Sequence, residues 1–156
     1  MLNALRFIFL MSIVTWVGMI IFYTLFVTPS IFKSLPRELA GDVVSHIFPK
    51  YWGIGYVAAI LSLASLIAMS FIEKVFPMAR VLILALMTAL TFYSGLVVAQ
   101  EAQTIKAQMK VVEDPQRLEE LRSEFRGVHR TSFALNLVVM VAGIVLVFLV
   151  SRNLRL

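Results

Sequence analysis

The chain has 156 residues, 60% of them hydrophobic, and a mean hydropathy of +0.91. Soluble domains are usually about 45–50% apolar, so this composition indicates an integral membrane protein with room for four spans and no second domain. The absence of cysteine excludes disulfides and thiolate metal sites. A net charge of +5 is ordinary for a protein that faces anionic lipid, and we infer no nucleic-acid function from it.

The first predicted span covers about residues 5–27, long enough to cross roughly 30 Å of hydrocarbon. Its short basic start resembles a signal peptide, but no small-residue cleavage pattern interrupts the apolar run, so we expect a retained helix. Its polar and aromatic residues share one face that should turn toward the other helices: Ser12, Thr15, Trp16, Met19 and Tyr23. Pro29 is predicted to end this helix.

A short helix is predicted over residues 35–48. Ser34 is a suitable N-cap, and Pro36 suits the first turn. Apolar residues then recur every four positions, at Leu39, Val43 and Ile47. The segment is too short to span, so it reads as an interfacial helix that lies on the membrane or over the mouth of the bundle. Pro49 is predicted to end it.

The second and third spans are predicted at about residues 51–72 and 78–100. Tyr51 and Trp52 form an aromatic belt where the chain enters the membrane. Each span has a side of small residues that permits close helix approach, namely Gly55, Ala58, Ser62, Ser65 and Ala68 in one and Thr88, Thr91, Gly95 and Ala99 in the other. The short turn between them implies antiparallel neighbours.

A helical hairpin outside the membrane is predicted over about residues 101–130. No breaker appears until Asp114 and Pro115, which are suited to cap and begin the next helix. That helix should continue through a fourth span at about residues 131–150. Apolar residues at coiled-coil-like spacing can hold the hairpin together, with Ile105, Met109 and Val112 facing Leu118, Leu121 and Phe125. The predicted fold is therefore an all-α, four-helix transmembrane bundle with a protruding hairpin.

A polar line runs along the last helix from the hairpin into the membrane. At 100° per residue, one face carries Arg122, Arg126, His129, Phe133 and Asn136, with Phe125 and Ser132 at its edge. Polar groups are costly in lipid, so they should face protein or a wet cavity. The nearest small polar faces offer Asn136 four partners: Thr15, Trp16, Thr88 and Thr91.

Two blocks of the chain resemble the transmembrane-protein-205-like family of small four-span membrane proteins. They are FKSLPRELAGDVVSHIFPKYWGI at residues 32–54 and LRSEFRGVHRTSFALNL at residues 121–137. The positions that match the family pattern are Pro36, Arg37, Gly41, Phe48, Pro49 and Tyr51, then Phe125, His129, Ser132 and Asn136. The resemblance implies a four-helix bundle and brings no established activity with it.

The first span, TWVGMIIFYTLFVTP, also looks distantly like that of copper-resistance D and HemJ-type membrane proteins. The latter are linked to haem synthesis, but the HemJ-type lysine and histidine pattern is not found here.

The candidate ligand-binding residues are Arg37, Arg122, Arg126, His129, Ser132 and Asn136. The arginines, with Arg130, suit an anionic lipid headgroup, a propionate or a phosphate. The alternative is a structural network in which they pair with Glu38, Asp42, Glu101 and Glu119. Asn136, Ser132 and the buried threonines then serve only as interhelical hydrogen-bond partners.

His129 has a second interpretation, as an axial haem ligand, a metal ligand or a proton relay. His46 lies on the same side of the membrane and is the second candidate for one haem. The alternative is an interfacial histidine at the mouth of the bundle. We find no catalytic dyad, phosphate loop or nucleophile with a paired base, which favours a protein without catalytic activity and leaves an enzyme as the open alternative.

The sequence favours a membrane protein that binds a lipid, a hydrophobic ligand or a protein partner at the bundle mouth. The hairpin is the candidate surface for a protein partner, and a homo-oligomer stays open. The competing class is a haem- or metal-dependent redox protein. The termini and the turn near Lys74 carry five of the fourteen lysines and arginines: Arg6, Lys74, Arg80, Arg152 and Arg155. The other nine lie on the hairpin side, so the raw count places the hairpin in the cytoplasm, whereas density near the span ends places the termini there. We favour cytoplasmic termini, in the inner membrane if the protein is bacterial.

Overall fold

The computed structural model describes residues 1–152, so Arg155 lies outside the described residues. The elements in order are α1 (Leu2–Phe22), the π-helix η1 (Tyr23–Val27), α2 (Thr28–Ser34), α3 (Arg37–Glu73), α4 (Met78–Tyr93), the π-helix η2 (Ser94–Val98), α5 (Ala99–Met109) and α6 (Pro115–Ser151). All regular structure within residues 1–152 is helical.

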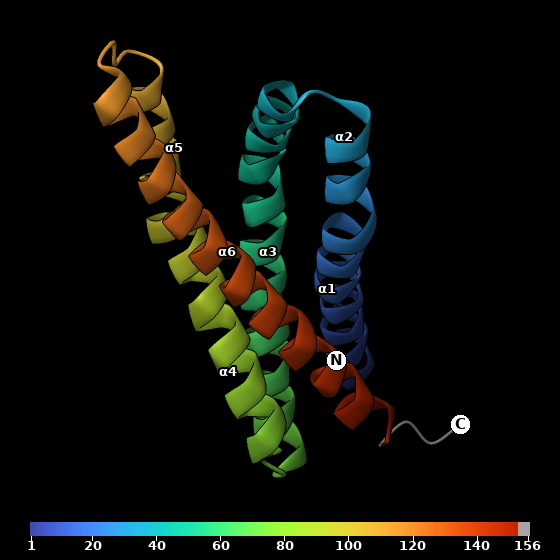
Figure 1. The fold of residues 1–156 in the computed structure, drawn as a ribbon. Helices are drawn as coiled ribbons and strands as arrows, with labels where there is room; N and C mark the ends of the chain where they lie inside the picture. Colours follow the sequence, from blue (N-terminus) through green and yellow to red (C-terminus); the bar gives the residue numbers. More distant parts are fainter. Residues whose placement is uncertain (153–156) are drawn as a thin grey trace.

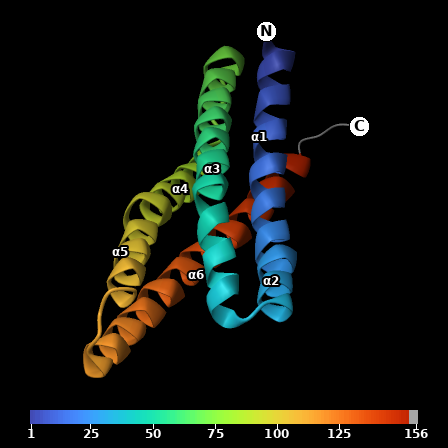
Figure 2. The same ribbon diagram turned by 90° about the horizontal axis from the view of Figure 1, so that it is seen from above.

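Four continuous helices, listed by their bounds, are long and apolar enough to cross a membrane: Leu2–Ser34, Arg37–Glu73, Met78–Met109 and Pro115–Ser151. They confirm the predicted all-α, four-helix transmembrane architecture. The α1 and α3 helices run side by side, α4 packs on α3, and α6 contacts α1, α4 and α5. Figures 1 and 2 show that α6 runs obliquely across the other helices rather than parallel to them.

The first helix does not end at Pro29. The α1, η1 and α2 segments form one continuous helix, and Pro29 stands in the first turn of α2. A proline ring in a helix clashes with the carbonyl four residues earlier. Here a π-helical turn, which has a wider backbone, lies directly before it and gives the ring room. The prediction that Pro29 ends the helix is therefore wrong.

The segment predicted as a helix over residues 35–48 is helical only from Arg37 on, and it is not separate. Ser34 was predicted as its N-cap but is the last residue of α2, and Pro36 occupies the N-cap position instead. The segment forms the first part of α3, which continues through Pro49. The proline removes one backbone hydrogen bond and costs about 3 kcal/mol. Packing offsets this cost because both sides of Pro49 are anchored, by Ala40 and Val44 before it and by Tyr51 after it, all of them buried. A helix break at Pro49 was thus a wrong prediction.

The small faces of the spans lie where they were predicted, inside the bundle. Ser62 and Thr91 are buried, and so is the predicted inward face of the first helix at Ser12, Trp16 and Tyr23. Gly95 shows why size matters, because a methyl group there would collide with the hydroxyl of Tyr56. Helices approach closely at such positions.

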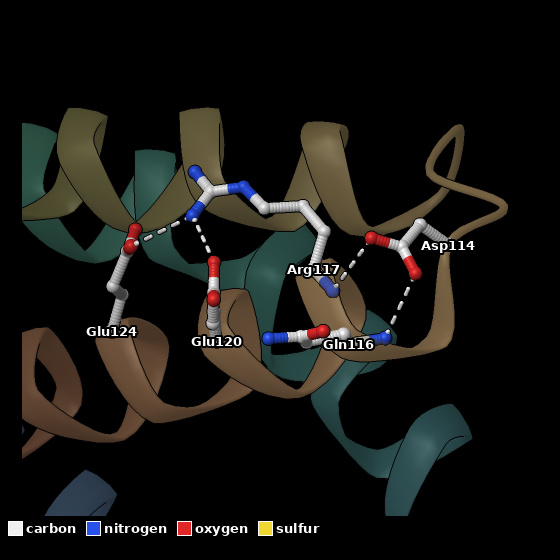
Figure 3. A network of polar contacts seen from close by, with 5 residues as sticks. All are labelled: Asp114, Gln116, Arg117, Glu120 and Glu124. Carbon is white, nitrogen blue, oxygen red and sulfur yellow. Dashed lines mark hydrogen bonds and ion pairs between the residues drawn. The ribbon is translucent and has the colours of Figure 1, made fainter.

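The α5–α6 hairpin is present, with Ile105 and Leu121 buried between its arms. Asp114 caps α6, as predicted, and its carboxylate accepts hydrogen bonds from the backbone N–H groups of Gln116 (3.1 Å) and Arg117 (3.3 Å). The Arg117 guanidinium also pairs with Glu120 at 2.9 Å and Glu124 at 3.4 Å (Figure 3). These exposed pairs run along the start of α6.

Candidate functional site

Asn136 is the one member of the predicted polar line that enters the bundle with hydrogen-bond partners on other helices. Its Oδ1 accepts from the Tyr51 hydroxyl at 2.7 Å, and its Nδ2 donates to Thr24 Oγ1 at 2.8 Å. The predicted partners were four other residues, Thr15, Trp16, Thr88 and Thr91, and that prediction is wrong. Asn136 of α6 instead meets Thr24 of η1 and Tyr51 of α3. Figure 2 shows the oblique path of α6 relative to α1 and α3.

The other members of the line lie on the outside of α6. Arg122 and Arg126 are exposed and pair with Glu119 of their own helix, at 3.5 and 3.3 Å. His129 is exposed and stacks on Phe125, with 6.3 Å between ring centroids. The structure therefore does not gather this line into one cavity.

The remaining predicted residues are scattered. Arg37 is exposed at the start of α3, Arg130 is exposed on α6 and Ser132 is half-buried. Within residues 1–152, none of the three has a side-chain hydrogen bond or an ion pair. Of the four carboxylates in the alternative network, Glu119 pairs with Arg122 and Arg126. Asp42 pairs with Lys106 instead of an arginine.

A lysine that the sequence reasoning missed ties the hairpin to α3. The Lys106 ammonium contacts Asp42 Oδ1 at 2.8 Å, Ser45 Oγ at 2.8 Å and the Gly41 carbonyl at 3.1 Å. The hydrogen bond and positive charge of Lys106 lower the pKa of Asp42. Only weak features of the sequence pointed to this contact. They are the polar groups within about one turn of α3 and the position of the lysine next to Ile105, which is buried.

The two histidines are both exposed, His46 on α3 and His129 on α6. His46 is exposed, and its Nδ1 lies 2.8 Å from the Asp42 carbonyl oxygen of its own helix. Residues 1–152 contain no group of three or more histidine and acidic side chains that could hold a metal ion. Neither histidine lines either of the two cavities described below, and the haem interpretation stays a prediction.

A small cavity with a mostly apolar lining lies beside Asn136. Its volume is about 10 Å³, and it is lined by Trp16, Met19, Ile20, Tyr51, Trp52, Gly55, Thr91, Ser94, Asn136 and Val139. An aromatic cluster closes one side, in which the ring centroids of Tyr23 and Tyr51 are 5.0 Å apart and those of Tyr51 and Trp52 are 5.1 Å apart. The sequence placed Tyr51 and Trp52 at the membrane edge, and gave no sign of this cluster.

A larger groove of about 400 Å³ lies on the outside of the bundle, between α1 and α3. Its lining is Met11, Ser12, Thr15, Gly53, Ile54, Val57, Ala58 and Leu61. Small residues on both helices keep the groove open, and larger apolar residues form its walls. The sequence reasoning missed it because Thr15 had been placed beside the inward face, whereas Thr15 and Gly53 are both exposed.

Comparison with known proteins gives a family and no activity. The family described as "Domain of unknown function (DUF4149)" matches residues 11–111, from α1 to just beyond α5. An uncharacterized protein of Aquifex aeolicus (strain VF5) is 40% identical over 48 residues, which is 31% of this chain and 36% of that protein. The chain therefore aligns with about a third of this relative's length. No solved structure matches.

The family match covers the groove and most of the small cavity, but not the second motif of the resemblance, at residues 121–137. The resemblance to transmembrane-protein-205-like and HemJ-type proteins thus stays an expectation. The family match over residues 11–111 covers well over half of the 156 residues: the chain belongs to the DUF4149 family.

Proposed function

We propose that this protein binds an anionic membrane lipid, with an acyl chain in the groove between α1 and α3. The groove itself is the observation that carries the proposal. Its volume of about 400 Å³ falls within the roughly 300–1,000 Å³ of ordinary ligand sites. Its walls are apolar side chains, with hydroxyl groups only at Ser12 and Thr15, which suits a hydrocarbon chain.

A lysine precedes the groove on the same face of α3. Lys50, Ile54, Val57 and Leu61 follow one another at steps of four, three and four, so they form one stripe along α3. The helix rises about 16 Å from Lys50 to Leu61 at roughly 1.5 Å per residue. One leaflet of a bilayer has about 15 Å of hydrocarbon, half of roughly 30 Å. A chain lying on Ile54, Val57 and Leu61 would thus place its headgroup beside Lys50.

Lys50 is available for that headgroup. It is exposed, and it makes no ion pair with any residue among 1–152. His46, also exposed, lies one turn earlier on the same stripe. A lysine near the membrane surface attracts an anionic lipid by about 1 kcal/mol. The ligand class, an anionic lipid, is the one predicted from the sequence. The proposed site lies on α3 and not on α6, because Arg122 and Arg126 already pair with Glu119.

Native mass spectrometry of the purified protein tests this proposal. The protein would be titrated with phosphatidylglycerol and, separately, with zwitterionic phosphatidylcholine. Wild type should retain phosphatidylglycerol preferentially. Val57→Trp should fill the groove and reduce binding of both lipids, whereas Leu86→Trp, at an exposed position of α4, is the matched control and should not.

The Lys50→Gln variant separates the contribution of the lipid headgroup to binding from that of the acyl chain. Loss of about 1 kcal/mol corresponds to roughly a fivefold loss of preference for the anionic lipid, with phosphatidylcholine binding unchanged. Equal lipid retention by wild type, Val57→Trp and Leu86→Trp would contradict the proposal, because it would mean that the lipids bind only as a non-specific annulus.

A further inference from the structure

We infer that the small interior cavity is a binding site for one neutral oxygen atom that accepts hydrogen bonds, sized for a water molecule. The site is independent of the lipid groove, since none of the residues that line it lines the groove. Two buried donors point to it.

Trp52 and Ser94 both line the cavity, with 8% and 1% of their surfaces exposed. Among residues 1–152, the indole Nε1 of Trp52 and the hydroxyl of Ser94 have no hydrogen-bond partner. An unpaired buried polar group costs about 1–3 kcal/mol, and in a membrane no lipid chain can satisfy it. Two such groups on one cavity indicate a shared partner.

The chemistry of the donors fixes the class of that partner. An indole N–H can only donate, so the partner must accept. A serine hydroxyl can donate or accept and adjusts by rotation. No charged side chain lines the cavity, so nothing there would neutralise an anion. A neutral oxygen fits these conditions.

The volume limits the size of the partner. A cavity needs about 10–15 Å³ to hold one water molecule, and this one measures about 10 Å³. A water accepts from Trp52 and still has two protons to donate. The same position would also suit the terminal oxygen of a carbonyl ligand, provided that the rest of the ligand reached it between the helices.

The site would complete a polar network across all four membrane helices. Tyr51, Asn136 and Thr24 already join α3, α6 and η1 by hydrogen bonds. Ser94 is the first residue of η2, in the third membrane helix. Both π-helical segments therefore supply a side chain to this region, and π-helical turns frequently occur at functional sites. An oxygen atom bound between Trp52 of α3 and Ser94 of η2 would connect the third membrane helix to this network.

Proton NMR of the tryptophan indole groups tests the inference in the intact protein. The chain has two tryptophans, so ¹⁵N-tryptophan labelling in lipid nanodiscs gives two indole signals, and Trp52→Phe identifies one of them. The Trp52 indole proton should show a cross-peak to long-lived water. Ser94→Ala should reduce that cross-peak at least twofold, because it removes the second partner.

Thr88→Ala is the matched control. Thr88 lies on α4, but its hydroxyl bonds to the Leu84 carbonyl of its own helix at 2.8 Å and does not line the cavity. Cross-peaks from the Trp52 indole to non-exchanging protons of a co-purified molecule would assign the oxygen to a ligand instead of water. The absence of both kinds of cross-peak, or a cross-peak that Ser94→Ala leaves unchanged, would overturn the inference.

Discussion

At the scale of single residues, the interior of this protein depends on a few polar groups with defined partners. Asn136 joins Tyr51 and Thr24, and Lys106 joins three acceptors of α3. The sequence correctly indicated that Asn136 must face protein, because an amide in lipid is costly. It could not identify the partners, because these depend on where α6 crosses the other helices.

Replacement of Asn136 by leucine removes both of its hydrogen bonds. Hydrogen bonds between membrane helices average about 0.6 kcal/mol each, so Asn136→Leu should lower the free energy of unfolding by about 1 kcal/mol. Thermal unfolding in detergent measures this loss. Ser132→Ala, on the same helix, is the control, and an equal stability of the two variants would contradict the hydrogen-bond assignment.

Gly95 is required for a different reason, the close approach of α3. A Cβ atom at Gly95 would overlap the ring of Tyr56, which is held by stacking on Phe92 with 4.5 Å between centroids. Gly95→Ala should therefore destabilise the protein by about 1–3 kcal/mol, the usual cost of overpacking.

Gly18→Ala is the matched substitution, since nothing lies within 4 Å of a Cβ atom at Gly18. Its melting temperature should stay near that of wild type. If Gly95→Ala and Gly18→Ala both kept a melting temperature near that of wild type, η2 and α3 would not be packed as described.

At the scale of elements, the prolines mark the limit of local reasoning. Pro29 and Pro49 were each expected to end a helix, because proline lacks an N–H group and crowds the preceding turn. Pro29 is accommodated by the π-helical turn before it, and Pro49 by packing on both sides. Neither compensation can be read from the residues next to the proline. The cap at Asp114 was predictable because all of its contacts lie within one turn.

The contact between Lys106 and α3 gives a prediction for the first part of α3. Lys106→Met should increase hydrogen–deuterium exchange in residues 37–48 and leave exchange in the membrane-crossing part of α3 unchanged. Lys110→Met removes the same charge from an exposed position that lacks these hydrogen bonds. The attachment of α5 to α3 would be contradicted if the two variants exchanged at the same rate.

The same contact should depend on pH in a defined direction. Lys106 lowers the pKa of Asp42 below its ordinary value of 3.8. A carboxyl group with a lowered folded-state pKa stabilises the fold above its unfolded pKa, and this contribution is lost as the pH falls through the folded value. Exchange in residues 37–48, corrected for intrinsic rates, should thus rise below pH 3.8 in wild type, and Lys106→Met should lack this rise.

At the scale of the whole molecule, the architecture was predictable and its internal geometry was not. Four long apolar runs and short connections suffice for a four-helix membrane bundle. The crossing of α6 depends on how side chains of several helices interdigitate, and small shifts there decide what meets at the centre. That is why the partners of Asn136 and the groove between α1 and α3 were not foreseen, whereas ligand binding at Arg122, Arg126 and His129 stays a prediction.

The central claim is that this groove holds an anionic lipid. The most direct measurement is a cryo-electron microscopy structure of the protein in nanodiscs of phosphatidylglycerol and phosphatidylcholine, with a bound antibody fragment to allow alignment. We predict a continuous acyl-chain density against Val57 and Leu61, with the headgroup beside Lys50. Density in the groove no stronger than that around the exposed faces of α4 and α6 would contradict the claim.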